Sequence, residues 1–536
     1  MSGGGAAGRL YLGLDSSTQS LTALVIDVTG DAARVVLDTS IAFDEVLPEY
    51  GTRHGVLPRT DPSVAVSSPV MWAEALDLMM ARLAASGLDL SRLAAVSGSA
   101  QQHGSVYLGA EGNARLSALD ASRPLAEQVA PLLSRPVAPI WMDSSTSAQC
   151  AQITAALGGA PVLAARTGSR AFERFTGPQI RKFATTDPEA YARTGRIHFV
   201  SSFLASLLAG HDAPVDPGDA SGANLMDLGS TSWWMDAVEA TAPDLARRLP
   251  AIVPSSAVAG TLSPYWRTRH GLPAAKVITW SGDNPCSLVG VGLVREGRVA
   301  ISLGTSDTIF GLMKEPRVDP DGTGHVFGAP TGDFMGLTCF SNGSLARDRV
   351  RDAYGLSWEG FSRALASTPP GNRGRILLPW FEPEITPTVP QPGAHRVGLD
   401  ADDVAGNVRG VVEAQQMAMA IHSRWMGVTI DAIHATGGAA VNRQILRVMA
   451  DVFGADVYVS SVTNSAALGA ALRAWHADAL AEGRPRSWEE ITAGLARPAH
   501  DTRIAPDRAR HAVYRELLPV YEACEARALG HSVAPR

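Results

Sequence analysis

The stretch "YLGLDSSTQSLTALV", residues 11–25, decides the fold, because it is one of two similar hairpins in the chain. An apolar strand over residues 9–14 leads into a tight turn rich in Asp, Ser and Thr, and a second apolar strand over residues 20–28 leaves it. The stretch "VAISLGTSDTIFGLM", residues 299–313, follows the same plan. Two related hairpins far apart in one chain predict two domains of similar architecture.

The sequence around these hairpins alternates between strand and helix patterns. An amphipathic helix is predicted over 67–87, with Ser68 as N-cap and Pro69 in the first turn. Short apolar strands follow near 92–97 and 137–141, and helices near 145–157 and 199–209. This alternation indicates an α/β protein. We place the domains at 9–296 and 297–536, the second with a C-terminal helical tail.

Composition narrows the functional class. The chain has 536 residues, 46% of them hydrophobic and 18% charged, and its net charge is −7. This length predicts two domains, and the acidic balance argues against nucleic acid or a membrane as partner. The four cysteines show no paired spacing, so neither a zinc site nor a disulfide framework is expected. The N-terminal "MSGGGAAGRL" does not resemble a signal peptide, and we expect a cytoplasmic protein.

Three turns could hold phosphate. Asp15, Ser17 and Thr18 lie in the first hairpin, and Gly304 and Thr305 lie in the second. In the third, "HATGGAAVNRQIL" (434–446), a strand enters a glycine-rich turn and a helix leaves it. Backbone N–H groups and hydroxyls in such turns can surround a polyphosphate. Read alone, each is equally an ordinary turn, and the chain has neither a P-loop nor a dinucleotide-binding motif.

A lone carboxylate stands in "WSGDNPCSL", residues 280–288. Asp283 is the only charged side chain between Lys276 and Arg295, and it follows an apolar strand. A carboxylate at a strand end can take the proton of a hydroxyl that attacks phosphorus. The alternative is structural, since Asp283 or Asn284 could cap the helix that begins near Pro285.

Two further segments carry polar groups that suit a polyhydroxylated ligand. "SGSAQQHGSVYL" (97–108) ends a strand with Gln101, Gln102 and His103, whose amides and imidazole offer directional donors and acceptors. "AFERFTGPQ" (171–179) offers Arg174 beside Glu173. The alternatives are a structural histidine in a turn and a solvated pair of charges.

Taken together, these segments resemble the FGGY family of sugar kinases. The resemblance covers roughly residues 9–525, and within the family it is greatest to animal-type members that act on xylulose. It is carried by seven segments in the family's order: "SGSAQQHGS", "IWMDSSTSAQC", "AFERFTGPQIRK", "SGDNPCSL", "VAISLGTSDTIF", "FSNGSLARD" and "ATGGAAVNRQIL". The resemblance implies two actin-like (ribonuclease H-like) ATPase domains flanking a central cleft.

The resemblance also implies roles for particular residues. Asp283 matches the catalytic base, and His103, Arg174, Asp283 and Asn284 match the sugar-binding positions. Asp15 matches the acid associated with Mg²⁺ and the phosphates. The positions implied to bind ATP are Ser17, Thr18, Gly304, Thr305, Trp358, Gly437, Gly438 and Asn442. The chain departs from the usual family pattern at Ser17, where glycine is common, and at Thr22, where a basic residue is common.

The implied reaction is ATP-dependent phosphorylation of D-xylulose to D-xylulose 5-phosphate by in-line transfer to its terminal hydroxyl, with Asp283 as general base. The resemblance allows a homodimer. Three alternatives stay open: a family kinase acting on ribulose, a polyol or a sugar acid; a nucleotide-dependent conformational switch of the actin fold; and a sugar sensor without activity.

Overall fold

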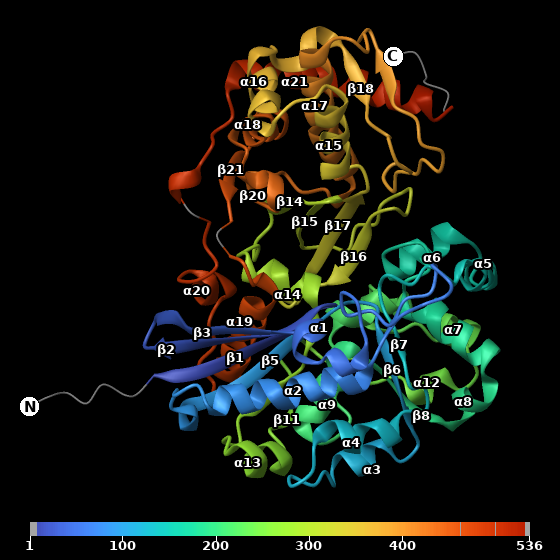
Figure 1. Ribbon diagram of the computed structural model, residues 1–536, viewed down its shortest axis with the longest axis vertical. Helices are drawn as coiled ribbons and strands as arrows, with labels where there is room; N and C mark the ends of the chain where they lie inside the picture. The colour runs from blue at the N-terminus through green and yellow to red at the C-terminus, as the bar shows by residue number, and fades with distance from the viewer. Residues whose placement is uncertain (1–7, 461, 499, 531–536) are drawn as a thin grey trace, which may run out of the picture. The chain divides into compact units, whose positions relative to one another are not determined.

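The computed structural model describes residues 8–460, 462–498 and 500–530 (Figure 1). Contacts divide the described chain into two compact units. Unit 1 comprises the described residues of Met1–Val294, Val326–Phe334 and Val462–Arg497, and unit 2 those of Arg295–His325, Met335–Ser461 and Pro498–Arg536. The sequence predicted one domain boundary, after residue 296. Two later segments, 326–334 and 462–497, therefore pack in unit 1 although they follow that boundary.

A twisted sheet in unit 1 is built around the first hairpin. Its strand order is β11-β12-β5-β1-β2-β3. The strands are β1 (Arg9–Ser16), β2 (Ser20–Thr29), β3 (Ala32–Ala42), β5 (Leu93–Ala100), β11 (Val258–Thr261) and β12 (Lys276–Ile278). β1 pairs antiparallel with β2 and parallel with β5, and β12 is also parallel to β5. The short β13 (Ser281–Gly282) pairs parallel with the end of β5.

Unit 2 repeats this arrangement around the second hairpin. Its neighbouring strands follow the order β17-β15-β14-β20-β21. They are β14 (Arg298–Leu303), β15 (Asp307–Met313), β17 (Phe334–Phe340), β20 (Ala432–Thr436) and β21 (Asp456–Val459). β14 pairs antiparallel with β15 and parallel with β20, as β1 does with β2 and β5. Both units therefore share one α/β plan, as the two similar hairpins predicted.

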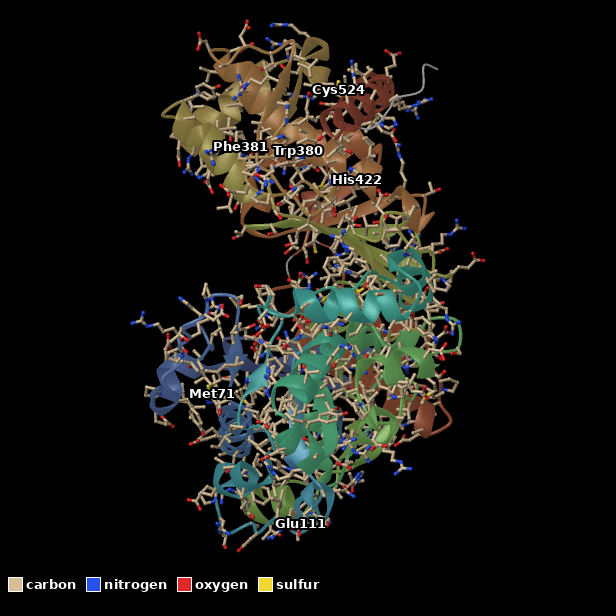
Figure 2. All side chains as sticks on the ribbon, turned by 90° about the vertical axis from the view of Figure 1, so that its right-hand side faces the viewer. Met71, Glu111, Trp380, Phe381, His422 and Cys524 are labelled. Carbon is tan, nitrogen blue, oxygen red and sulfur yellow. The ribbon has the colours of Figure 1, made fainter. Side chains whose placement is uncertain are left out.

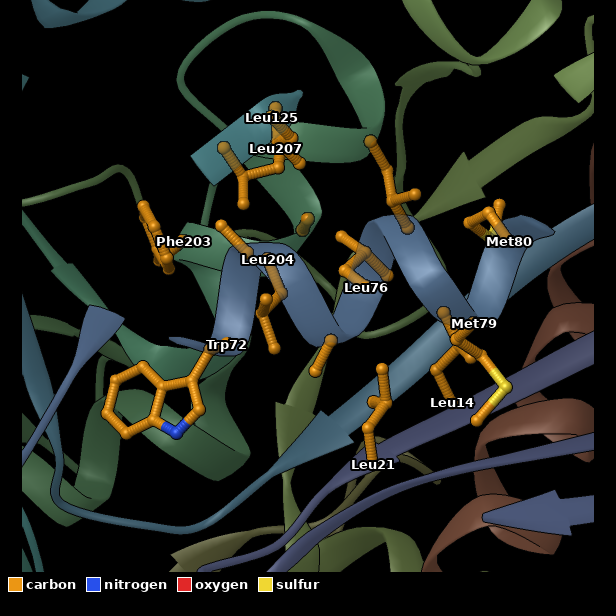
Figure 3. Close-up of a cluster of buried hydrophobic side chains, with 14 of the residues drawn as sticks. Leu14, Leu21, Trp72, Leu76, Met79, Met80, Leu125, Phe203, Leu204 and Leu207 are labelled. Atoms are coloured by element: carbon orange, nitrogen blue, oxygen red, sulfur yellow. The ribbon is translucent and has the colours of Figure 1, made fainter. Parts of the chain in front are cut away.

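Helix α2 (Pro69–Ala84) shows why the core of unit 1 forms where it does. Ser68 caps it by accepting the N–H of Met71 at 3.3 Å, as the sequence predicted. Figure 3 shows the apolar face of the helix above Leu14 and Leu21, at the β1–β2 hairpin, and beside Leu204 of α9 (Val200–Ala209). Burying this face removes Trp72, Leu76, Met79 and Met80 from water.

The remaining predicted helices also form. They are α5 (Ser147–Ala156), α14 (Asp283–Gly290) and α18 (Arg443–Phe453). A further helix, α19, spans Ser465–Ala481. The strand predicted near 137–141 is reduced to β7 (Ala138–Pro139).

The C-terminal helix α21 (Arg508–Ala528), for which the sequence suggested no role, packs into the core of unit 2. That core also contains α17 (Val404–His422) and the buried Trp380, and α21 contributes Tyr521 and Cys524 to it (Trp380 and Cys524 labelled in Figure 2). Within the described part of the chain, no helix combines the length and apolar character needed to cross a membrane.

Candidate functional site

In unit 1, the carboxyl ends of three parallel strands bring the predicted residues to one edge of the sheet. Asp15 of β1 lies opposite Ser99 of β5, and Ser281 of β13 lies opposite the same Ser99 from the other side. Asp283 follows β13 directly, and His103 follows β5. Ligands of α/β proteins usually bind at such an edge, where loops leave neighbouring parallel strands.

Asp15 and Asp283 form a pair of carboxylates at this edge. The Oγ of Ser99 donates to Oδ1 of Asp15 at 2.6 Å. Burial, together with the charge of Asp283, raises the pKa of Asp15 to about 7 against the opposing hydrogen bond from Ser99. Burial likewise raises the pKa of Asp283 to about 6, although N–H groups of Asn284 and Gln102 favour its ionised form. Both acids thus titrate close to neutrality.

Asp283 is the first residue of α14, and Gly282 is the N-cap. Neither Asp283 nor Asn284 therefore occupies the N-cap position, and Gly282 makes no side-chain capping bond. Oδ1 of Asp283 accepts the backbone N–H of Asn284 at 2.8 Å and its Nδ2 at 3.0 Å. The same Nδ2 donates to Oε1 of Gln102 at 3.0 Å, so the amide of Asn284 is held between two acceptors.

His103 is buried and has a positive φ of 74°, which is uncommon for a residue with a Cβ. Its Nδ1 lies 2.9 Å from the carbonyl oxygen of Gly222. A carbonyl only accepts, so Nδ1 carries the proton and Nε2 remains an acceptor. Burial, helped by the charge of Arg174, lowers the pKa of His103 to about 3. The imidazole is therefore neutral at physiological pH, with one nitrogen able to accept a hydroxyl proton.

Arg174 lies in the loop before α7 (Thr176–Thr186). Its guanidinium carbon is 5.2 Å from the ring centre of Phe172 and 5.8 Å from that of Phe175. The Phe175 ring in turn lies 4.5 Å from the imidazole of His103. The half-buried cation is thus held by aromatic faces next to His103, an arrangement that differs from the solvated charge pair considered above.

The first hairpin turn joins this group through Thr18. Its Oγ1 accepts the indole N–H of Trp141 at 2.8 Å and lies 3.4 Å from Oε1 of Gln101. Ser17 instead bonds within the turn, with its N–H donating to the carbonyl of Ser20 at 2.9 Å. Thr22 lies directly opposite Asp15 on β2, is buried, and bonds through Oγ1 to the hydroxyl of Ser40 at 2.8 Å. A polar but uncharged side chain therefore faces Asp15 here.

Unit 2 assembles the second group of predicted residues at the equivalent edge of its sheet. Gly304 and Thr305 lie in the turn between β14 and β15, and Gly437 and Gly438 follow the neighbouring parallel strand β20. Gly437 has a φ of 88°, and a Cβ there would lie 2.6 Å from the carbonyl oxygen of Leu303. Only glycine lets the two turns approach so closely.

Asn442 and Trp358, also in unit 2, are the other two residues implied to bind ATP. Asn442 caps α18 by accepting the N–H groups of Gln444 and Ile445. Its Nδ2 donates to Oγ of Ser362 at 2.9 Å, which ties the cap to α16 (Trp358–Ser367). Trp358 opens α16 with 42% of its surface exposed. The arrangement offers an aromatic side chain, which suits a nucleotide base.

No group of three or more His, Cys, Asp or Glu side chains that could hold a metal ion occurs among the residues described. Asp15 nevertheless offers a hard oxygen donor, and burial disfavours its charge. A cation beside it would offset that cost, so Asp15 fits Mg²⁺.

Comparison with known protein families matches both units. Residues 10–290 match the N-terminal domain of the FGGY family of carbohydrate kinases, and residues 299–477 match its C-terminal domain. The chain belongs to this family. The resemblance drawn from seven short segments is thereby confirmed.

The similarity to individual family members covers most or nearly all of the chain. The chain is 42% identical to xylulose kinase of Mus musculus over 99% of its own length and 96% of that protein. It is 43% identical to xylulose kinase 2 of Arabidopsis thaliana, with 87% of each chain covered. The crystal structure of xylulose kinase from Rhodospirillum rubrum shares the family fold, with a TM-score of 0.80, 21% identity, and coverage of 97% of this chain and 99% of that one.

Some of the groups that shape the site were not identified from the sequence. The segment from Asp216 to Asn224 supplies Gly222, whose carbonyl orients His103, and Gly218, whose carbonyl accepts Nε2 of Gln102 at 3.1 Å. These contacts use backbone atoms, and backbone acceptors leave no residue-type signal in a single sequence.

Proposed function

We propose that the chain phosphorylates the terminal hydroxyl of D-xylulose with ATP, giving D-xylulose 5-phosphate and ADP. The observation that carries the proposal is the position of Asp283, a carboxylate at the start of α14 whose pKa burial raises to about 6 beside Asn284 and Asp15. A base of this pKa is ionised at neutral pH yet retains proton affinity, as proton abstraction from a hydroxyl requires. The names of the relatives support xylulose as the sugar.

His103, Asn284 and Arg174 would hold the sugar. The bare Nε2 of His103 accepts one sugar hydroxyl, and the guanidinium of Arg174 donates to another. The amide of Asn284 donates beside Asp283, which sets the direction from which the terminal hydroxyl approaches. Fixing these contacts before reaction supplies much of the catalytic advantage in phosphoryl transfer, where the protein forms no covalent bond.

The reaction step involves few groups of the chain. The terminal oxygen of the sugar bonds to the γ-phosphorus, the bond from that phosphorus to the β–γ bridging oxygen breaks, and the hydroxyl proton passes to Asp283. Asp15 would hold Mg²⁺, which neutralises charge on the phosphates. The turns at Gly304, Thr305, Gly437 and Gly438 would bind the phosphates, together with Ser17 and Thr18. Asn442 and Trp358 would contact the adenosine.

Two further properties stay predictions, the compartment and the oligomeric state. We assign the enzyme to the cytoplasm, and the buried thiols of Cys150 and Cys286, whose pKa values burial raises to about 12, suit a reducing compartment. A homodimer is testable by light scattering.

The decisive experiment is an ATP-consumption screen of the purified chain against pentuloses, polyols and sugar acids, with D283N as the matched inactive control. We expect D-xylulose to give the highest kcat/KM. A higher value for a sugar acid would favour the alternative in which Arg174, beside His103, binds a substrate carboxylate. ADP release that no sugar stimulates would contradict a sugar kinase of any kind.

A further inference from the structure

A buried arginine lies beneath the predicted catalytic residues and has no part in the reaction described above. Arg473 lies in the middle of α19, with only 2% of its surface exposed. α19 belongs to unit 1, although in sequence it follows most of unit 2. An arginine is rarely buried this deeply unless it is paired, so its partners are informative. Both terminal nitrogens of Arg473 have partners, whereas its buried Nε has none among the described residues.

The guanidinium of Arg473 donates to acceptors on separate segments that converge on the site. Nη1 lies 3.2 Å from the carbonyl oxygen of Gly98 on β5 and 3.3 Å from Sγ of Cys286 on α14. Nη2 lies 2.7 Å from the carbonyl oxygen of Thr279 and 3.2 Å from that of Ser255. Thr279 and Cys286 bracket Asp283, and Gly98 lies on the strand that leads to His103. One side chain thus joins the segment before Asp283, the helix after it and the neighbouring strand.

Asp216 completes the network as the counter-charge. Its Oδ2 lies 3.5 Å from Nη2 of Arg473 and accepts the hydroxyl of Ser255 at 2.7 Å. Its Oδ1 accepts the hydroxyl of Ser281 at 2.9 Å and the N–H of Asp219 at 3.0 Å. Ser281 stands two residues before Asp283. The ion pair therefore holds the segment before the proposed base at the side chain of Ser281 and at the carbonyl of Thr279.

The contact between α19 and the site leaves no space for adjustment. A Cβ at Gly290 of α14 would lie 1.8 Å from the carbonyl oxygen of Ser465, and one at Gly469 would lie 1.9 Å from that of Cys286. A Cβ at Gly13 of β1 would lie 2.0 Å from the carbonyl of Ala467. Glycine therefore allows α19 to touch both the helix that carries Asp283 and the strand that carries Asp15.

A contribution to folding stability is a weak explanation for a buried network of this kind. Buried ion pairs can often be replaced by well-packed apolar side chains without loss of stability, because desolvation offsets the attraction of the charges. Their hydrogen bonds, however, specify one arrangement of the segments they join. Here the joined segments are β5, the residues just before Asp283, and α14. Their relative placement sets the positions of Asp283 and Asn284.

We propose that Arg473, paired with Asp216, is the positioning residue for the catalytic base, fixing the start of α14 so that Asp283 and Asn284 face the sugar hydroxyl correctly. This inference rests on the proposed sugar-kinase function. It assigns a role in sugar phosphorylation to a helix that lies outside both the phosphate turns and the sugar contacts.

The test compares R473M, R473K and a matched control, R409M. Arg409 is a similarly buried arginine of unit 2 that pairs with Glu413 and Tyr514. Because a misplacement of about 1 Å can cost about 100-fold in rate, R473M should lose about that much kcat. Its KM for ATP should stay within about twofold of wild type. R473K, which keeps the charge and three donors, should recover part of the loss, and R409M should keep wild-type kcat per folded molecule.

The rate of amide hydrogen exchange in the peptide spanning 280–290 reports how firmly this segment is held, and it can be measured without any catalytic turnover. R473M should speed exchange there, whereas R409M should not. If R473M does not fold, the charge-balanced D216N/R473M replaces it, with the same expected loss of kcat. Wild-type kcat in the variant that folds, unchanged exchange at 280–290, or equal losses in R473M and R409M would overturn the inference. A wild-type enzyme that phosphorylates no sugar, with exchange still altered by R473M, would instead refute the proposed function alone.

Discussion

Replacing Asp283 by Asn should abolish activity and, at the same time, stabilise the protein at alkaline pH. The carboxyl has a folded-state pKa of about 6 against an ordinary value of 3.8. At 1.36 kcal/mol for each pH unit, ionising it in the folded protein costs up to about 3 kcal/mol. The side chain is only half-buried by surface area, so solvent reduces this figure, and we expect about 1–2 kcal/mol. Asn resembles the protonated acid in shape and carries no such cost.

The sign of the effect fixes its pH dependence. A carboxyl whose folded pKa is raised destabilises the folded state once it ionises, so the advantage of D283N is complete above about pH 7. It shrinks as pH falls through 6 and disappears below about pH 4, where the wild-type carboxyl is protonated in both states. For a unit of this size, about 1–2 kcal/mol corresponds to a rise in Tm of roughly 2–5 °C.

The assay is thermal unfolding of wild type and D283N between pH 5 and 8, with EDTA present so that no divalent cation binds the site. The matched control is D402N, which removes an exposed carboxylate of unit 2 and should leave Tm unchanged. A D283N protein that is no more stable than wild type at pH 8, or a stability difference that does not vary with pH, would refute the reasoning. Sugar phosphorylation that persists in D283N would refute the role of Asp283 as base.

Three further predictions concern the proposed reaction. The acid limb of the kcat/KM profile for the sugar should fall near pH 6, because Asp283 must be ionised to accept the proton and its pKa is about 6; a limb near pH 4 would contradict this. Replacing His103 by Ala should raise the sugar KM about tenfold or more while the ATP KM stays near wild type, since one hydrogen bond to the sugar is lost; equal changes in both constants would place His103 elsewhere. Replacing Trp358 by Ala should weaken ATP binding by roughly tenfold, measured by calorimetry, with the sugar KM unaffected; unchanged ATP affinity would exclude stacking on this ring.

Much of the fold was predictable because its signals are local. The hairpins at 11–25 and 299–313 show apolar strands around short polar turns, and each became the centre of a sheet. The residues that end those strands were predictable as site candidates for the same reason, since parallel strands present their carboxyl ends at one edge. Asp283 was conspicuous because no other charge lies near it in sequence.

The domain division shows where local signals end. A single cut after residue 296 separates the two hairpins, but α19 packs with unit 1 after the chain has built most of unit 2. An alanine-rich helix with small residues on one side can pack against any close-fitting partner, and the sequence does not identify which one. Its partners became visible only through the glycines at 13, 290 and 469, where backbone carbonyls occupy the space that a Cβ would need.

The role of Arg473 likewise could not be predicted from the local sequence. In sequence it is one arginine within a helix, and an arginine in a helix is usually solvated. Its acceptors are mostly backbone carbonyls at Gly98, Ser255 and Thr279, so no complementary side chain in the sequence points to it. Contacts to reacting groups require particular side chains and can be read from residue types. Contacts that hold those groups in place can be made by any backbone, so a positioning residue emerges only when the fold brings its acceptors together.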